Sequence, residues 1–179
     1  GLAGLVAALR LARGGASVTL VSAGVGGLQL SQGTLDVLGY APDRVTRPFE
    51  ALDAFGAAHP EHPYAQLGSG NVRSAVASVV DAVGASLLEW PTDANLQLPT
   101  AVGAIRPTAV AQPSMAAADL ARRGDHRFVV VGLRRLKDFQ PALIAGNLAR
   151  TTAPGGGAIA ARPAWVDVEA RPGEHDTSG

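Results

Sequence analysis

The chain has 179 residues, 47% of them hydrophobic, so it is long enough to bury a core and too apolar to be disordered. Basic and acidic residues balance at 15 each, which excludes the strong field that draws proteins to nucleic acid or to anionic lipid. Without cysteine the chain can form no disulfide and hold no iron–sulfur cluster, so any such cluster must lie in a partner. No run reaches the roughly 20 apolar residues of a membrane span. We expect a cytoplasmic protein that contacts a membrane only through a partner.

The first five residues, GLAGL, match the second half of a G-x-G-x-x-G fingerprint, with Gly1 and Gly4 as its glycines. Apolar residues then recur at helical spacing, which predicts a helix over 1–13 that ends at Gly14 and Gly15. The N-terminus of this helix would present backbone N–H groups and a positive dipole end to a phosphate. The alternative is close packing of small residues against a sheet. Because the only methionine is internal, we expect an N-terminal fragment without its first strand and C-terminal half.

Residues 16–21 are apolar and rich in β-branched side chains, which predicts a buried parallel strand and hence half of a βαβ unit. Nucleotide-binding folds usually place an acid after this strand to hold the adenosine ribose, and Ser22 stands there instead. We therefore do not expect ribose recognition of the usual kind.

A glycine-rich, mostly uncharged loop follows over residues 24–39. Such a loop can lie against a ligand through its backbone. Polar side chains gather at its centre, namely Ser31, Gln32, Thr34 and Asp36. Asp36 is either a helix cap or a polar contact beside a cofactor.

Two further helices are predicted over 48–58 and 70–89, joined by an extended connection that the prolines of 59–63 enforce. His59 and His62 lie in this connection, with no acidic or thiol cluster nearby to complete a metal site. We therefore expect them to be solvated or to cap a helix, and we predict no metal site.

Apolar residues between positions 96 and 105, interrupted by a proline and a glycine, predict two short antiparallel strands that lead into Arg106 and Thr108. Arg106 either binds a substrate phosphate through a charge-assisted fork, with Thr108 beside it, or lies on a loop surface.

The clearest strand is predicted over 128–132 and is followed by a helix over 139–149, with Asp138 as its N-cap and Pro141 in its first turn. A last strand is predicted over 165–168, and the tail from Gly173 is expected to fray. We find no Ser-His-Asp, zinc or Walker pattern, and the catalytic residue stays unknown.

Several segments, in this order, resemble the B subunit of anaerobic, quinone-linked glycerol-3-phosphate dehydrogenase. They are GLAGL at 1–5, LSQGTLDVL at 30–38, HPYAQLG at 62–68, GAIRPT at 103–108, VVVG at 129–132 and LKDFQ at 136–140. The similarity covers roughly residues 1–150. It places the chain among flavoproteins with two dinucleotide-binding motifs.

The resemblance implies an oxidoreductase that passes a hydride from glycerol 3-phosphate to a flavin and yields dihydroxyacetone phosphate. Electrons would continue to quinone through an iron–sulfur C-type subunit at the inner face of the membrane, beside a catalytic A-type subunit. Carried over by position, Gly1 and Gly4 match the phosphate turn, with Ser22 after the strand. Three residues match a flavin-proximal loop, namely Ser31, Gly33 and Thr34. The family flavin is described as FMN, and FAD stays open.

We therefore expect an α/β fold, a partial Rossmann-like FAD/NAD(P)-binding domain formed by 1–44 and 126–150. Residues 45–125 would form an inserted α+β cap region that contacts the substrate, and 151–179 the irregular start of the absent C-terminal half. The alternatives are a flavin-bearing or structural subunit without catalysis, and another flavoprotein of the fumarate-reductase or oxidase type.

Overall fold

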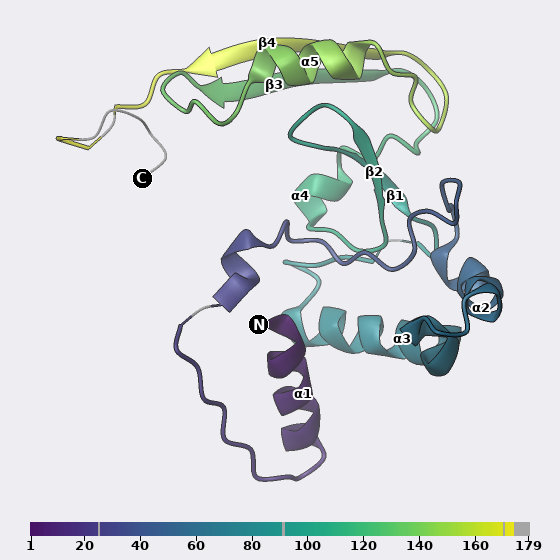
Figure 1. Cartoon of the computed structure of the whole chain (residues 1–179). Helices are drawn as coiled ribbons and strands as arrows, with labels where there is room; N and C mark the ends of the chain where they lie inside the picture. The colour runs from purple at the N-terminus through teal and green to yellow at the C-terminus, as the bar shows by residue number, and fades with distance from the viewer. Residues whose placement is uncertain (25, 91, 170, 174–179) are drawn as a thin grey trace.

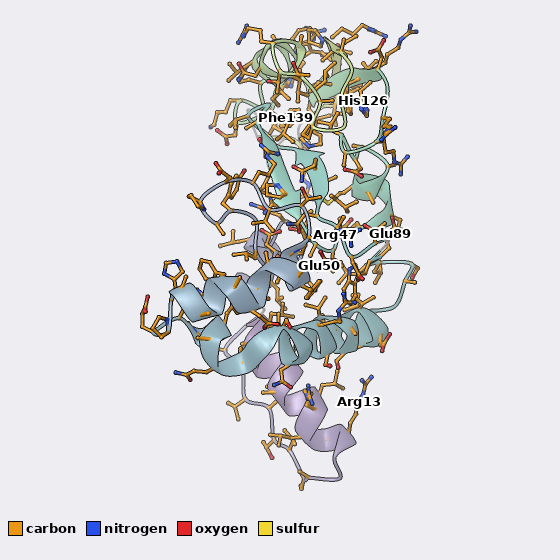
Figure 2. All side chains as sticks on the ribbon, turned by 90° about the vertical axis from the view of Figure 1, so that its right-hand side faces the viewer. Arg13, Arg47, Glu50, Glu89, His126 and Phe139 are labelled. Atoms are coloured by element: carbon orange, nitrogen blue, oxygen red, sulfur yellow. The ribbon has the colours of Figure 1, made fainter. Side chains whose placement is uncertain are left out.

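The computed structural model describes residues 1–24, 26–90, 92–169 and 171–173. Its elements are α1 (Leu2–Arg13), the 3-10 helix η1 (Gly26–Leu30), α2 (Pro48–Ala58), α3 (Pro63–Val83), β1 (Leu96–Pro99), β2 (Ile105–Thr108), α4 (Pro113–Ala116), β3 (His126–Leu133), α5 (Pro141–Ala149) and β4 (Ile159–Val166). Figure 1 shows α1 at one end, the β1–β2 pair in the middle and the β3–α5–β4 unit at the other end. The side view of Figure 2 agrees, with Arg13 and Phe139 far apart.

The β3–α5–β4 unit is a parallel βαβ crossover. The strands pair in register from His126↔Ile159 to Leu133↔Val166, and α5 packs on both of them. Alternate residues of β3 face the helix, as a half-buried strand requires. Gly132 permits the close approach, because a Cβ there would lie 2.3 Å from Cγ of Pro141. The α/β class and the strand-to-helix unit are confirmed, and β4 begins earlier than the predicted strand at 165–168.

The start of α5 corrects one prediction. Gln140, not Asp138, is the N-cap, and Pro141 occupies the first turn. Proline suits that position because its missing N–H has no helical partner there and its φ is already helical. Asp138 lies exposed in the turn before the helix.

The helix α1 is confirmed, and Gly15, at φ 86°, follows its end. The strand predicted over 16–21 is wrong, because these residues adopt no strand and Val21 is 88% exposed. A parallel strand forms only beside a neighbour that satisfies its N–H and C=O groups. The described parallel strands, β3 and β4, lie at the opposite end of the molecule (Figure 1).

The consecutive helices α2 and α3 pack against each other. The bounds of α2 are as predicted, whereas α3 begins at Pro63 and ends at Val83 instead of spanning 70–89. Gly68, at φ 71°, interrupts α3, and Gly84, at φ 93°, ends it. The expected capping role of His62 is confirmed, since its Nδ1 accepts the Tyr64 N–H at 3.2 Å.

The predicted antiparallel strands β1 and β2 are confirmed, with Leu96 opposite Thr108. Their turn contacts α5, where the Asn147 amide donates to the Val102 carbonyl at 2.7 Å. On the other side, Asn95 holds the loop that precedes α2. Its Nδ2 donates to the carbonyls of Leu38 at 2.9 Å and Val45 at 2.8 Å, and the residue is 3% exposed. The middle layer therefore joins the helical pair to the βαβ unit.

Replacing Asn95 by alanine should lower the free energy of unfolding by about 2 kcal/mol, because two carbonyls in the interior lose their donor. The substitution also removes Oδ1 of Asn95, which is buried without a hydrogen-bond partner among the described residues. The free energy gained by removing this unpaired oxygen is smaller than the free energy lost at the two carbonyls. Urea unfolding measures the change. Asn71→Ala, at an exposed helical position, is the matched control and should stay within about 0.5 kcal/mol of wild type. Equal effects of the two substitutions would contradict the prediction.

Candidate functional site

The predicted site residues fall into two groups. Gly1, Gly4 and Ser22 belong to the α1 end, whereas the loop over 31–36 and the end of β2 form a second group in the middle of the molecule. The first group depends on α1 and the loop after it, and the second on the pairing of the loop over 31–36 with the segment at the end of β2.

Gly1 is the N-cap of α1, and Gly4 lies in its first turn. No side chain caps this helix and its first turn contains no acidic residue. A Cβ placed at Gly1 or Gly4 would meet no described atom within 4 Å, so none of the described elements packs tightly against these glycines. The loop returns to this point, since an ideal Cβ on Gly26 would lie 3.6 Å from the Gly1 nitrogen. The residues present fit a phosphate held by backbone N–H groups.

Ser22 forms a local turn in the loop that leads to Gly26. The Gly24 N–H donates to its Oγ at 3.2 Å, and the Ser22 hydroxyl donates to the Gly24 carbonyl. The side chain is exposed. A carboxylate to hold a ribose is therefore replaced here by a hydroxyl engaged with its own backbone.

The second group is assembled by backbone pairing between distant segments. The Leu35 N–H donates to the Val110 carbonyl at 2.9 Å, and the Val110 N–H returns to the Leu35 carbonyl at 3.1 Å. This bridge aligns the loop over 31–36 with the end of β2.

Thr34 and Asp36 meet Arg106 and Thr108 at this bridge. The Arg106 guanidinium donates to Oδ2 of Asp36 and, at 2.9 Å, to Oγ1 of Thr34. The Thr108 hydroxyl donates to Oδ1 of Asp36, and Thr108 is 1% exposed. The structure thus brings together four polar residues that the sequence holds in two separate motifs. Thr108 is buried, so it contacts the other three residues only from the protein interior, through Asp36.

Tyr64 adds a third motif to the same place. Its hydroxyl donates to the Val37 carbonyl at 2.7 Å. Burial raises the pKa of Tyr64 above its ordinary value of 10.0, and the Asp36 carboxylate raises it further. The segments at 30–38, 62–68 and 103–108, separate in the sequence, therefore converge around Asp36.

Arg106 forms the charged wall of a small pocket of about 210 Å³, which is lined by Gln32, Leu98, Pro99, Thr100, Ala101, Arg106 and Met115. Ligand pockets usually measure about 300–1,000 Å³, so this one suits a small group. A cation at the edge of an apolar cavity is suited to bind an anionic group of a small molecule.

Gly33 is required by the shape of this loop. Its φ is 70°, and a Cβ there would lie 2.2 Å from Nε2 of Gln112. Its N–H donates to Oγ of Ser31 at 3.3 Å, so the two residues form one turn. The backbone beside Thr34 is thereby fixed.

The histidine pair serves structure. His62 caps α3 and lies edge-on against Phe55, and the His59 ring also contacts Phe55, tilted and with ring centroids 4.5 Å apart. Among the described residues, no three side chains of His, Asp or Glu gather as metal ligands. No helix within those residues is long and apolar enough to cross a membrane.

Sequence reasoning missed the central position of Asp36 and gave Tyr64 no role. Asp36 caps no helix of the described structure, and its carboxylate accepts hydrogen bonds from Arg106 and Thr108 instead. The sequence signal was its place in the 30–38 segment, but its partners could not be named without the fold.

The pKa of Tyr64 gives a pH test of this geometry. A raised folded-state pKa stabilises the native state below pH 10, and that contribution is lost as the pH rises through the folded-state value. The free energy of unfolding of wild type should therefore fall relative to Tyr64→Phe between pH 8 and pH 11. Urea unfolding of both proteins measures this. A difference independent of pH would contradict the burial of Tyr64 beside Asp36.

The chain is similar to the B subunits of several anaerobic glycerol-3-phosphate dehydrogenases. It is 35% identical over 158 residues to the protein from Vibrio cholerae, and 31% over 159 residues to the protein from Aliivibrio fischeri. It is 38% identical over 157 residues to a probable B subunit from Halobacterium salinarum. These matches cover 84–86% of this chain and 35% of each relative, so the chain spans about a third of their length.

No solved structure matches the chain significantly. The FAD binding domain family matches residues 1–177, nearly the whole chain. This match indicates flavin binding, and it names FAD, one of the two flavins that the sequence left open. The chain belongs to the FAD binding domain family.

Proposed function

We propose that this chain is part of a flavin-dependent subunit of a respiratory glycerol-3-phosphate:quinone oxidoreductase. The subunit oxidises glycerol 3-phosphate to dihydroxyacetone phosphate, and the electrons reach quinone through an iron–sulfur partner. Two findings support the proposal, namely the family match and the names of the relatives. The observation that carries it is the convergence of three motif segments on Asp36 beside the Arg106 pocket.

Arg106 is the proposed ligand of the substrate phosphate. Its planar guanidinium matches a phosphate, and it faces a pocket of a size suited to a small molecule. Thr108 is buried and contributes indirectly, through its hydrogen bond to Asp36. Ser31, Gly33 and Thr34 form the proposed flavin-proximal loop, and Thr34 contacts Arg106. This contact would bring the substrate phosphate close to the flavin loop.

Gly1 and Gly4 are the proposed ligands of the flavin phosphate, and Ser22 belongs to the loop that returns to Gly1 at Gly26. Bound flavin would supply the hydride acceptor for oxidation of the secondary alcohol. The family name favours FAD, whereas a serine at position 22 in place of a ribose-binding acid favours FMN.

We propose the domain division from the sequence for the longer protein. Residues 1–44 and 126–150 form the flavin-binding part, 45–125 an inserted cap region, and 151–179 the start of a further segment. The expected partners are a catalytic A-type subunit and an iron–sulfur C-type subunit. Through them the protein would lie at the cytoplasmic face of the membrane. Resemblance to the B-subunit family supports this arrangement.

Gly4→Ala tests the flavin site. A Cβ at Gly4 meets no atom within 4 Å, so the variant should fold, and alanine favours a helix. It would, however, occupy the space of a phosphate at the helix end. We expect the flavin content of the purified longer protein to fall severalfold. Gly70→Ala is the matched control, because Gly70 is also helical and also has open space around it. Unchanged flavin content in Gly4→Ala would remove Gly4 from the site.

The decisive experiment uses the longer protein, purified with and without its neighbouring subunits. Its flavin is released and identified by mass, and glycerol 3-phosphate is titrated while flavin absorbance is recorded. We expect bleaching, and we expect Arg106→Ala to raise the KM for glycerol 3-phosphate at least about tenfold through loss of a charge-assisted contact. A protein without flavin would overturn the proposal and leave a structural subunit.

A further inference from the structure

We propose that Asp36 is the positioning residue of Arg106. It holds the guanidinium in the direction in which a substrate phosphate can bind, before the substrate arrives. The inference rests on the proposed function and extends it to a residue outside the predicted site.

Both carboxylate oxygens of Asp36 are engaged. Oδ2 accepts from Arg106 on the exposed side, and Oδ1 accepts from the buried hydroxyl of Thr108 on the inner side. The Thr108 Oγ1 lies 3.3 Å from the carbonyls of both Leu35 and Val110, within the bridge that joins loop and strand. Asp36 is therefore anchored to the interior at one oxygen and directs Arg106 with the other.

Arg106 is held at two points. Its side chain is 26% exposed, and its terminal nitrogens donate to Asp36 and Thr34, respectively. A guanidinium has five N–H groups in one plane, so two fixed contacts set the direction of the other three. An arginine so held has already lost most of its rotamer freedom, and a ligand need not impose that loss on binding.

The Asp36 carboxylate also repels a phosphate, so two effects of removing it compete. The Asp36 side chain is 48% exposed, and solvent therefore screens the repulsion. Loss of orientation is not screened, because it arises from the freedom of the Arg106 side chain itself. We expect the positioning effect to exceed the relief of repulsion.

The test measures glycerol 3-phosphate oxidation by the longer protein in its complex. Asp36→Ala should raise KM about three- to tenfold, the factor expected for one freed long side chain, with kcat and flavin content nearly unchanged. Asp43→Ala, at an exposed aspartate of the same connection, is the matched control and should leave KM unchanged. If Asp36→Ala does not fold, Asp36→Asn replaces it, since its single acceptor oxygen can serve only one of the two donors.

A double-mutant cycle separates positioning from general structure. If Asp36 acts through Arg106, then Asp36→Ala should add nothing to the KM of Arg106→Ala. The inference would be overturned if the effects of the two substitutions on KM add in the double variant. It would also be overturned if Asp36→Ala lowers KM, or if Asp36→Ala loses both flavin and kcat. If KM rises in Arg106→Ala but is unchanged in Asp36→Ala, the positioning role of Asp36 is overturned and the phosphate role of Arg106 stands. An unchanged KM in Arg106→Ala would overturn the phosphate role as well.

Discussion

The structure depends on the closure of the loop over 31–46 against β1 and β2. Backbone bonds between Leu35 and Val110 fix one end of this contact, and the buried amide of Asn95 fixes the other through Leu38 and Val45. Buried polar groups stabilise only when they are paired, so these contacts permit little variation in how the loop lies. The rest of the middle layer is arranged around them.

Because the loop is fixed in this way, its side chains face partners from distant segments. Arg106 and Thr108 reach Asp36 from β2, and Tyr64 reaches the loop from the first turn of α3. The contact between the loop and the β1–β2 pair also forms the small pocket that Arg106 lines, since Gln32 of the loop and Leu98 of β1 line it too. The packing of the loop therefore also positions the residues of the candidate site.

The elements that the sequence predicted well are those with local causes. The periodicity of α1 and α2, the turn between β1 and β2, and the β-branched run of β3 all depend on neighbouring residues. Prediction failed where a distant partner decides whether an element forms, or where the backbone angle of one glycine, such as Gly84, decides where a helix ends. The segment over 16–21 has strand composition but lies beside no strand in the described structure, and α4, with four residues, is too short for a periodicity. The prolines of residues 59–63 predicted an extended connection, but His62 is the N-cap of α3 and Pro63 is its first residue.

By itself, the sequence determined the α/β class, the family and the candidate residues Gly1, Gly4, Ser31, Gly33, Thr34, Arg106 and Thr108, because motifs are local patterns of residue type. It could not determine which of these residues meet. Only the tertiary structure joined Thr34 to Arg106, placed Asp36 between Arg106 and Thr108, and kept Gly1 and Gly4 at a separate helix end. The physical reason is that contacts between distant segments depend on chain closure and on the pairing of buried polar groups, which no local pattern encodes.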